Sequence, residues 1–119
     1  MDNNIKEKKE ALETLIDFNQ RLVKNMTIIV KELSGNPLDD TQEFLKGILD
    51  AMNWEIQVMN GTMDLLNNER ERINKEAFND KIIKLSEKVK EKDDEGIAIA
   101  IQDLIPEFEN LQNSAKEVV

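Results

Sequence analysis

The sequence predicts an all-α protein in which four helices form an antiparallel up-down bundle. Apolar residues recur at the three-four spacing of amphipathic helices through four segments of the chain. Glycine, proline, asparagine and aspartate, which favour helix caps and turns, stand between those segments. Hydrophobic residues at 39% and charged residues at 34% fit a globular protein with a heavily charged surface, and 119 residues suffice for one core. We therefore expect a single domain over residues 1–119.

The first predicted helix spans residues 4–33. Its apolar side chains form one continuous stripe along the helix. Gly35 accepts the left-handed conformation that ends many helices, and Pro37 cannot continue a helix. A tight helical hairpin should therefore follow, with the second helix antiparallel to the first.

The second predicted helix spans residues 41–68. Asp40 and Glu43 have the Asp-x-x-Glu spacing of a capping box, which predicts the start of this helix. The chain becomes polar after the helix, and this predicts a loop. The pattern also allows one continuous helix through Arg70 and Arg72, so the boundary between the second and third helices stays open.

The apolar side chains of helix 41–68 cover an unusually wide arc of about 220° at 100° per residue. A helix that meets a single neighbour needs little more than about 100°. We therefore expect this helix to be the central one of the bundle, or to meet a second chain. Trp54 lies at the edge of the arc beside Ala51, Val58 and Leu65. These four residues are the candidate partner-binding surface.

The last two predicted helices span residues 75–92 and 95–116. Asn74 is placed to cap the first of them, whose apolar stripe is narrow, as suits a peripheral helix. The acidic turn before the last helix ends the third. Pro106 lies inside the last helix, but the apolar stripe stays in phase across it. We expect a kink at Pro106, not a break.

Composition excludes several classes of function. The chain has no histidine and no cysteine, which removes the commonest general base, the commonest metal ligand and the thiol nucleophile. The net charge is −9, so the basic surface of a nucleic-acid binder is absent. The N-terminus lacks the pattern of a signal peptide, and no stretch has the length of a membrane span. We expect a cytoplasmic protein that binds neither nucleic acid nor membrane.

Two polar residues occupy apolar positions. Asn19 falls in the stripe of the first helix, and Glu55 falls in the middle of the wide arc of the second. An antiparallel hairpin places them level with each other. A buried carboxylate needs a partner, so we expect the Asn19 amide to donate a hydrogen bond to Glu55. The pattern leaves open whether this buried pair is functional or only sets the register of the two helices.

Carboxylates alone can hold a metal, as in the all-α pyrophosphohydrolases that bind magnesium between facing helices. Glu7, Glu10 and Glu13 have suitable spacing but lie on the polar face of the first helix. No second acidic set faces them, and magnesium needs converging oxygen ligands. The sequence therefore predicts no catalytic residue, no cofactor-binding residue and no metal ligand.

The run from Asp93 to Phe108 resembles the C-terminal helix of small uncharacterised all-helical proteins of Gram-positive bacteria. In those proteins an acidic turn leads into an aliphatic helix with a late proline. The resemblance implies a bacterial protein with a kinked last helix, and it implies no activity. In size, acidity and helical content the chain is also similar to the export chaperones of flagellar and type III secretion systems, with no motif behind the similarity.

These observations favour a non-enzymatic protein-interaction module, such as a small cytosolic chaperone or adaptor of the secretion-chaperone type. The partner would be another polypeptide, or the protein itself as a homodimer. Two alternatives stay open: a carboxylate-dependent magnesium or manganese enzyme of the pyrophosphohydrolase type, and a purely structural self-associating bundle.

Overall fold

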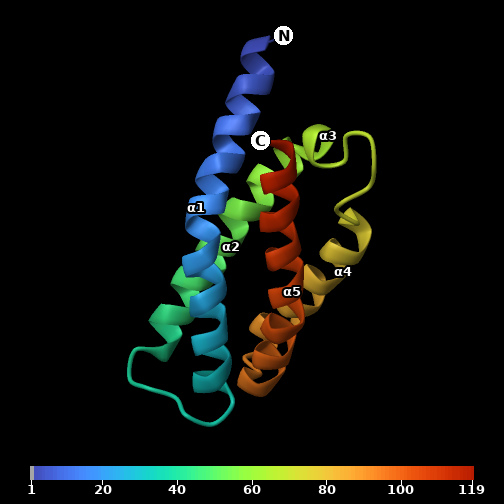
Figure 1. Ribbon diagram of the computed structural model, residues 1–119. Helices are drawn as coiled ribbons and strands as arrows, with labels where there is room; N and C mark the ends of the chain where they lie inside the picture. Colours follow the sequence, from blue (N-terminus) through green and yellow to red (C-terminus); the bar gives the residue numbers. More distant parts are fainter. Residues whose placement is uncertain (1) are drawn as a thin grey trace.

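The computed structural model describes residues 2–119, with side chains described from residue 4, and this part of the chain is helical with no strand (Figure 1). The prediction of an all-α protein is confirmed. The helices are α1 (Asp2–Leu33), α2 (Thr41–Gly61), α3 (Met63–Leu66), α4 (Lys75–Glu91) and α5 (Asp94–Val118).

The helices pack as two hairpins that meet through α1 and α5. Helix α1 packs against α2 on one side and α5 on the other, and α4 packs against α5. In Figure 1, α1 and α5 run in opposite directions side by side, with α2 and α4 behind them. No comparable packing joins α2 to α4 in the described structure. The prediction that helix 41–68 is the central helix is therefore wrong, because α1 and α5 hold that place.

The core lies mainly between α1 and α5. The rings of Phe78 and Phe108, with centroids 5.3 Å apart, bring α4 against the same core. The fully or nearly fully buried apolar side chains of α1 and α5 are Leu12, Leu15, Leu22, Met26, Ile29, Leu33, Ile97, Ala98, Ala100, Ile101, Leu104, Phe108, Leu111 and Ala115. Burial of these apolar side chains is the main favourable term in the stability of the fold.

The connection between α1 and α2 differs from the prediction in its chemistry. Gly35 has φ 126°, which confirms its expected role at the end of α1. The Asp40 side chain makes no capping hydrogen bond, so the predicted capping box is wrong. The side-chain hydrogen bonds at this connection come from buried Thr41. Its hydroxyl accepts from the Leu38 amide and donates to Glu32 Oε1, both at 2.7 Å. The hydroxyl therefore ties the loop to the last turn of α1.

The predicted helix 41–68 is interrupted after Gly61, so its predicted extent is wrong. The Thr62 hydroxyl donates to the Val58 carbonyl at 2.7 Å, and the short α3 begins after this break. Glycine and a threonine that bonds back to the preceding turn both weaken a helix at this point. Leu65 therefore lies in α3 and not on the strip of α2 that carries Trp54.

The ends of α4 and α5 are close to the predicted positions. Asn74 Oδ1 accepts from the Ala77 amide at 3.0 Å, which confirms it as the cap of α4. Lys92 ends α4 with φ 55°, and Asp93 caps α5 by accepting from the Gly96 amide at 3.0 Å. Helix α5 runs unbroken through exposed Pro106, as expected. The kink at this proline stays a prediction.

Among the described residues, no helix combines the length and the apolar character needed to cross a bilayer.

Candidate functional site

The wide apolar arc of α2 divides into a buried middle and two uncovered flanks. The middle, which includes Met52 and Met59, is buried in the core. One flank, with Phe44 and Trp54, lines a groove against α1. The other flank, with Ile56, lines a groove against α4. The width of the arc therefore reflects exposed apolar surface as well as core packing.

The groove between α1 and α2 encloses about 380 Å³. We call it the α1/α2 groove, and its lining is mostly apolar. It is lined by Phe18, Arg21, Leu22, Asn25, Glu43, Phe44, Gly47, Ile48, Ala51, Trp54 and Glu55. The rings of Phe18 and Trp54 meet edge to face across it, with centroids 5.7 Å apart. Phe18 is 52% exposed and Trp54 is 40% exposed, so both rings are available to a ligand.

Glu55 is the buried polar residue of this groove. Its side chain is 1% exposed, and neither carboxylate oxygen has a hydrogen-bond partner in the part of the chain that the structure describes. Burial away from water disfavours the charged form and raises the pKa of Glu55 from 4.5 to about 8. At neutral pH the carboxyl group is therefore mostly protonated, in a helix whose other buried positions are almost all apolar.

The predicted hydrogen bond between Asn19 and Glu55 is wrong. Both side chains are buried, as expected, but Asn19 Nδ2 donates to the Phe108 carbonyl and to Gln112 Oε1, each at 3.1 Å. These acceptors belong to α5, because α5 and not α2 covers this side of α1. Asn19 therefore ties α1 to α5 and leaves Glu55 without its expected donor.

Of the four predicted partner-binding residues, two line the α1/α2 groove and two do not. Ala51 and Trp54 line the α1/α2 groove and are exposed. Val58 lies one turn further along the same helix and is half-buried against the core. Leu65 is half-buried in α3. The structure adds Phe18 from α1, whose aromatic ring at the edge of its apolar stripe was the available signal in the sequence.

Charged side chains lie on both walls of the α1/α2 groove. Arg21 comes from α1 and Glu43 from α2, and the other helices contribute no charged residue to the lining. Neither side chain forms an ion pair within residues 4–119. The described side chains contain no group of three carboxylates placed to hold a metal ion. The chemistry of this groove is therefore that of one buried carboxyl group among aromatic and aliphatic side chains.

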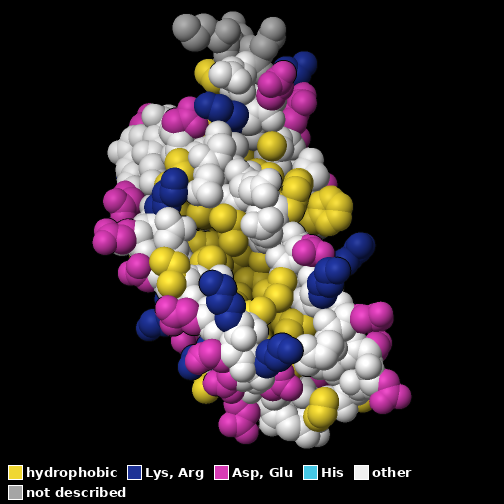
Figure 2. Space-filling view, turned by 180° about the vertical axis from the view of Figure 1, so that it is seen from behind, with side chains coloured by type: hydrophobic (Ala, Val, Ile, Leu, Met, Phe, Trp, Pro, Cys, Tyr) yellow, Lys and Arg dark blue, Asp and Glu magenta, His cyan; other side chains and the backbone are white. Residues whose placement is uncertain are grey.

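A second groove separates α2 from α4 and encloses about 330 Å³. Figure 2 shows the face that is turned away in Figure 1, where apolar side chains floor a hollow bordered by basic side chains. Leu49, Met52 and Ile56 line the groove from α2. This groove is the direct result of the missing contact between α2 and α4.

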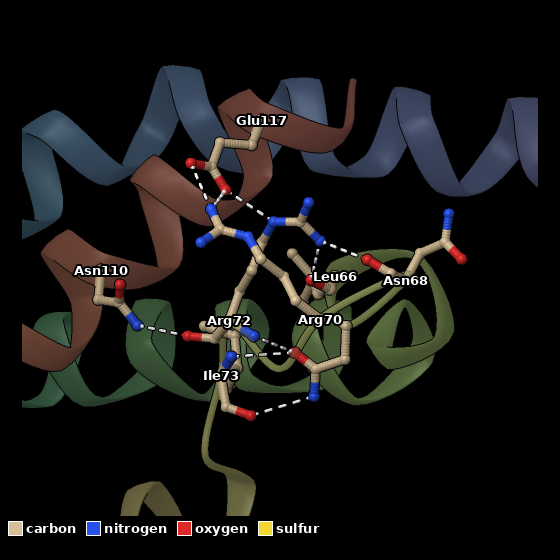
Figure 3. Close-up of polar contacts among 8 residues, drawn as sticks. Leu66, Asn68, Arg70, Arg72, Ile73, Asn110 and Glu117 are labelled. Carbon is tan, nitrogen blue, oxygen red and sulfur yellow. Dashed lines mark hydrogen bonds and ion pairs between the residues drawn. The ribbon is translucent and has the colours of Figure 1, made fainter.

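A polar cluster fastens the segment between α3 and α4 to the end of α5 (Figure 3). Arg70 donates to both oxygens of Glu117, at 2.9 and 2.7 Å, and Arg72 Nε donates to Glu117 Oε2 at 2.6 Å. These two guanidinium groups lower the pKa of Glu117. Since Glu117 already binds both arginines, the cluster is a structural clamp and not a free anion site. Sequence reasoning missed it, because the partners are far apart in the chain.

The α1/α2 groove lies within a known domain family, and the clamp lies partly outside it. Residues 10–114 match a family model described as "Domain of unknown function (DUF8042)". The chain belongs to this family. No curated protein and no solved structure is detectably similar to the chain. The DUF8042 match covers the whole lining of the α1/α2 groove, from Phe18 to Glu55, whereas Glu117 of the clamp lies outside it.

Proposed function

We propose that this protein is a non-enzymatic interaction module of the cytosol, a small chaperone or adaptor that binds a segment of another polypeptide in the α1/α2 groove. One observation carries the proposal: Trp54 and Phe18 stand exposed at an apolar groove that no other part of the described chain covers. Aromatic anchors in such pockets supply much of the energy of protein interfaces. In this proposal α1, α2, α4 and α5 are an up-down antiparallel bundle that serves as a rigid frame.

The charge of the chain favours a different polypeptide over a second copy as the occupant. Each copy carries a net charge of −9, so two copies repel one another over long range, whereas a basic segment is attracted. An apolar groove of about 380 Å³ accepts a few side chains and not a whole domain. The expected partner is therefore a basic segment that presents apolar side chains to the groove.

Affinity capture with matched variants tests the proposal. Trp54→Ala removes the aromatic anchor, and Ala51→Asp places a charge on the groove wall. Gln57→Asp is the control, because Gln57 is also exposed on α2 but does not line the groove. We expect the wild type and Gln57→Asp to retain the same polypeptide in a fixed ratio, and both groove variants to lose it while keeping their helical circular dichroism.

Two results would contradict the proposal. The first is retention of the same polypeptide by Trp54→Ala and Ala51→Asp at wild-type levels. The second is a wild-type dimer in light scattering that Ala51→Asp converts to a monomer, because the groove would then hold a second copy of the chain.

A further inference from the structure

Glu55 is a buried carboxyl group whose two oxygens have no hydrogen-bond partner in the described structure. It is the one ionisable residue among the buried residues of the described chain, and it lines an open groove. Asn19 Nδ2, the donor expected to bind it, is committed to α5, and Asn19 Oδ1 can only accept a hydrogen bond. An unpartnered buried carboxyl group costs free energy in either protonation state, and more in the charged state. A ligand that supplies a donor to Glu55 would remove this cost.

We propose that the base of the α1/α2 groove binds the ammonium group of a lysine side chain, with Glu55 as its counter-ion and with Phe18 and Trp54 against its aliphatic stem. The proposal rests on the proposed function for the source of that lysine, which is the bound polypeptide. It assigns to the groove a ligand class, an organic cation, that the aromatic anchors alone do not specify.

The lining of the groove matches the parts of a lysine side chain. The aliphatic stem is apolar, and apolar side chains such as Leu22, Ile48 and Ala51 line the same groove as Glu55. An ammonium group is attracted to a carboxylate and to aromatic ring faces. Anionic ligands would meet the negative field of a chain with net charge −9.

Lysine fits this site better than arginine. A guanidinium group has five N–H donors in a rigid fork, whereas an ammonium group has three donors on a compact head. Glu55 is the one buried carboxyl group of the groove, and most of the remaining lining is apolar. A guanidinium at the base would therefore leave more donors without acceptors, and each of these is costly away from water.

Binding of the ammonium group should release a proton to the buffer. Burial raises the pKa of Glu55 to about 8, so at pH 7 about 0.9 of the molecules carry the carboxyl proton. The bound cation favours the carboxylate, and the carboxyl O–H bond breaks with transfer of the proton to water. Arg21 and Glu43 are the other charged groups that line the groove. Arg21 carries the same charge as the ligand, so Arg21→Ala should tighten the binding of a cation.

The experiment uses n-butylammonium chloride, which reproduces a lysine side chain, with 1-butanol as the neutral control. Trp54 is the single tryptophan of the chain, so its fluorescence reports occupancy of the groove without a label. We expect saturable binding of n-butylammonium, tighter than binding of 1-butanol. Affinity should rise about 50-fold from pH 6 to pH 8, since protons compete for a group with a pKa of about 8.

Two matched variants locate the effect. Glu55→Gln keeps the shape of the side chain and removes its charge, and should weaken n-butylammonium at least tenfold at pH 8, abolish the pH dependence and leave 1-butanol unchanged. Glu43→Gln removes a charge from the rim of the same groove and should change the affinity less than twofold. Calorimetry at pH 7 in two buffers of different ionisation heat should show release of about one proton by the wild type and none by Glu55→Gln.

Several outcomes would overturn the proposal. It fails if n-butylammonium binds no tighter than 1-butanol, or binds equally to the wild type and Glu55→Gln; Glu55 would then be only a protonated core residue. If the polypeptide of the capture experiment binds Glu55→Gln as tightly as wild type, the lysine assignment fails while the proposed function stands. If n-butylammonium behaves as expected but no polypeptide is lost from the groove variants in the capture experiment, the cation site is supported and the proposed function fails. The assignment of the cation to a lysine of a bound polypeptide then fails as well.

Discussion

Glu55 couples the stability of the fold to pH. Its pKa is 4.5 in an unfolded chain and about 8 in the folded protein, so between these values the folded state binds a proton that the unfolded state has lost. Stability contributed by Glu55 is therefore fully present below pH 4.5 and is lost as pH rises to 8. The loss is on the order of 3 kcal/mol between pH 5 and pH 8.

Glu55→Gln should remove this dependence, because glutamine does not titrate. Urea unfolding of both proteins at several pH values checks the prediction: the variant should gain stability relative to wild type by on the order of 3 kcal/mol from pH 5 to pH 8. Asp64 and Glu117, whose pKa values are lowered by Lys8 and by the two arginines of the clamp, contribute equally to both proteins and cancel in the difference. Parallel pH profiles of the two proteins would show that Glu55 is solvated or paired.

Two glycines in helices should respond in opposite ways to alanine. A Cβ at Gly47 would meet no atom within 4 Å, so Gly47→Ala should raise the free energy of unfolding by about 1 kcal/mol through helix propensity alone. A Cβ at Gly96 would clash with the Asp93 carboxylate that caps α5 and would lie 2.7 Å from Lys88 Cδ. Gly96→Ala should therefore be destabilising despite the better propensity. Thermal unfolding of the two variants checks the contrast, and a gain at both positions would contradict it.

At the scale of elements, the side-chain amide of Asn67 holds the conformation of the segment between α3 and α4. Asn67 Oδ1 accepts from the amides of Arg72 and Ile73, each at 2.9 Å, and its Nδ2 donates to the Ile73 carbonyl at 3.0 Å. Asn67→Ala leaves those backbone groups without partners, and should cost about 2 kcal/mol in urea unfolding. Asn68→Ala is the control, since its exposed side chain makes no hydrogen bond in the described structure, and should change stability by less than about 0.5 kcal/mol. Equal effects would show that the clamp does not need Asn67.

Helix ends marked by a turn glycine or a capping asparagine were predictable, whereas the end of α2 inside a continuous apolar pattern was not. Gly35 and the Asn74 cap act within a few residues, so the sequence pattern contains their cause. The end of α2 was missed although its cause is local, because Gly61 and the Thr62 hydroxyl, which donates to the Val58 carbonyl, interrupt the helix inside an apolar pattern. A periodic apolar pattern continues through Leu65 whether or not the helix does.

At the scale of the whole molecule, the chain forms an open arrangement in the spatial order α2, α1, α5, α4. The sequence predicted the helical class, the two hairpins and the unusual apolar width of α2. It could not predict which helix lies at the centre, because apolar surface that is buried and apolar surface that lines a groove have the same pattern. For the same reason Trp54 and Ala51 were found as candidate residues, whereas their opposite wall on α1, including Phe18, was not.

The sequence pattern also could not show which helix covers Asn19, and this is why the predicted hydrogen bond from Asn19 to Glu55 was wrong. Its burial and that of Glu55 followed from their positions in apolar stripes, but the choice of partner depended on which helix covers α1 at that level. Because α5 takes this place, the amide binds the Phe108 carbonyl. Glu55, which lines the α1/α2 groove, is consequently left without a donor.

The central claim is that the folded molecule holds an unpartnered, uncharged carboxyl group at the base of an open groove. Titration of the Glu55 carboxyl carbon by NMR tests this claim most directly. In the free protein the carbon resonance should titrate with a midpoint near pH 8, and saturating n-butylammonium should lower this midpoint by at least one pH unit. A midpoint near 4.5 that n-butylammonium does not move would contradict the account.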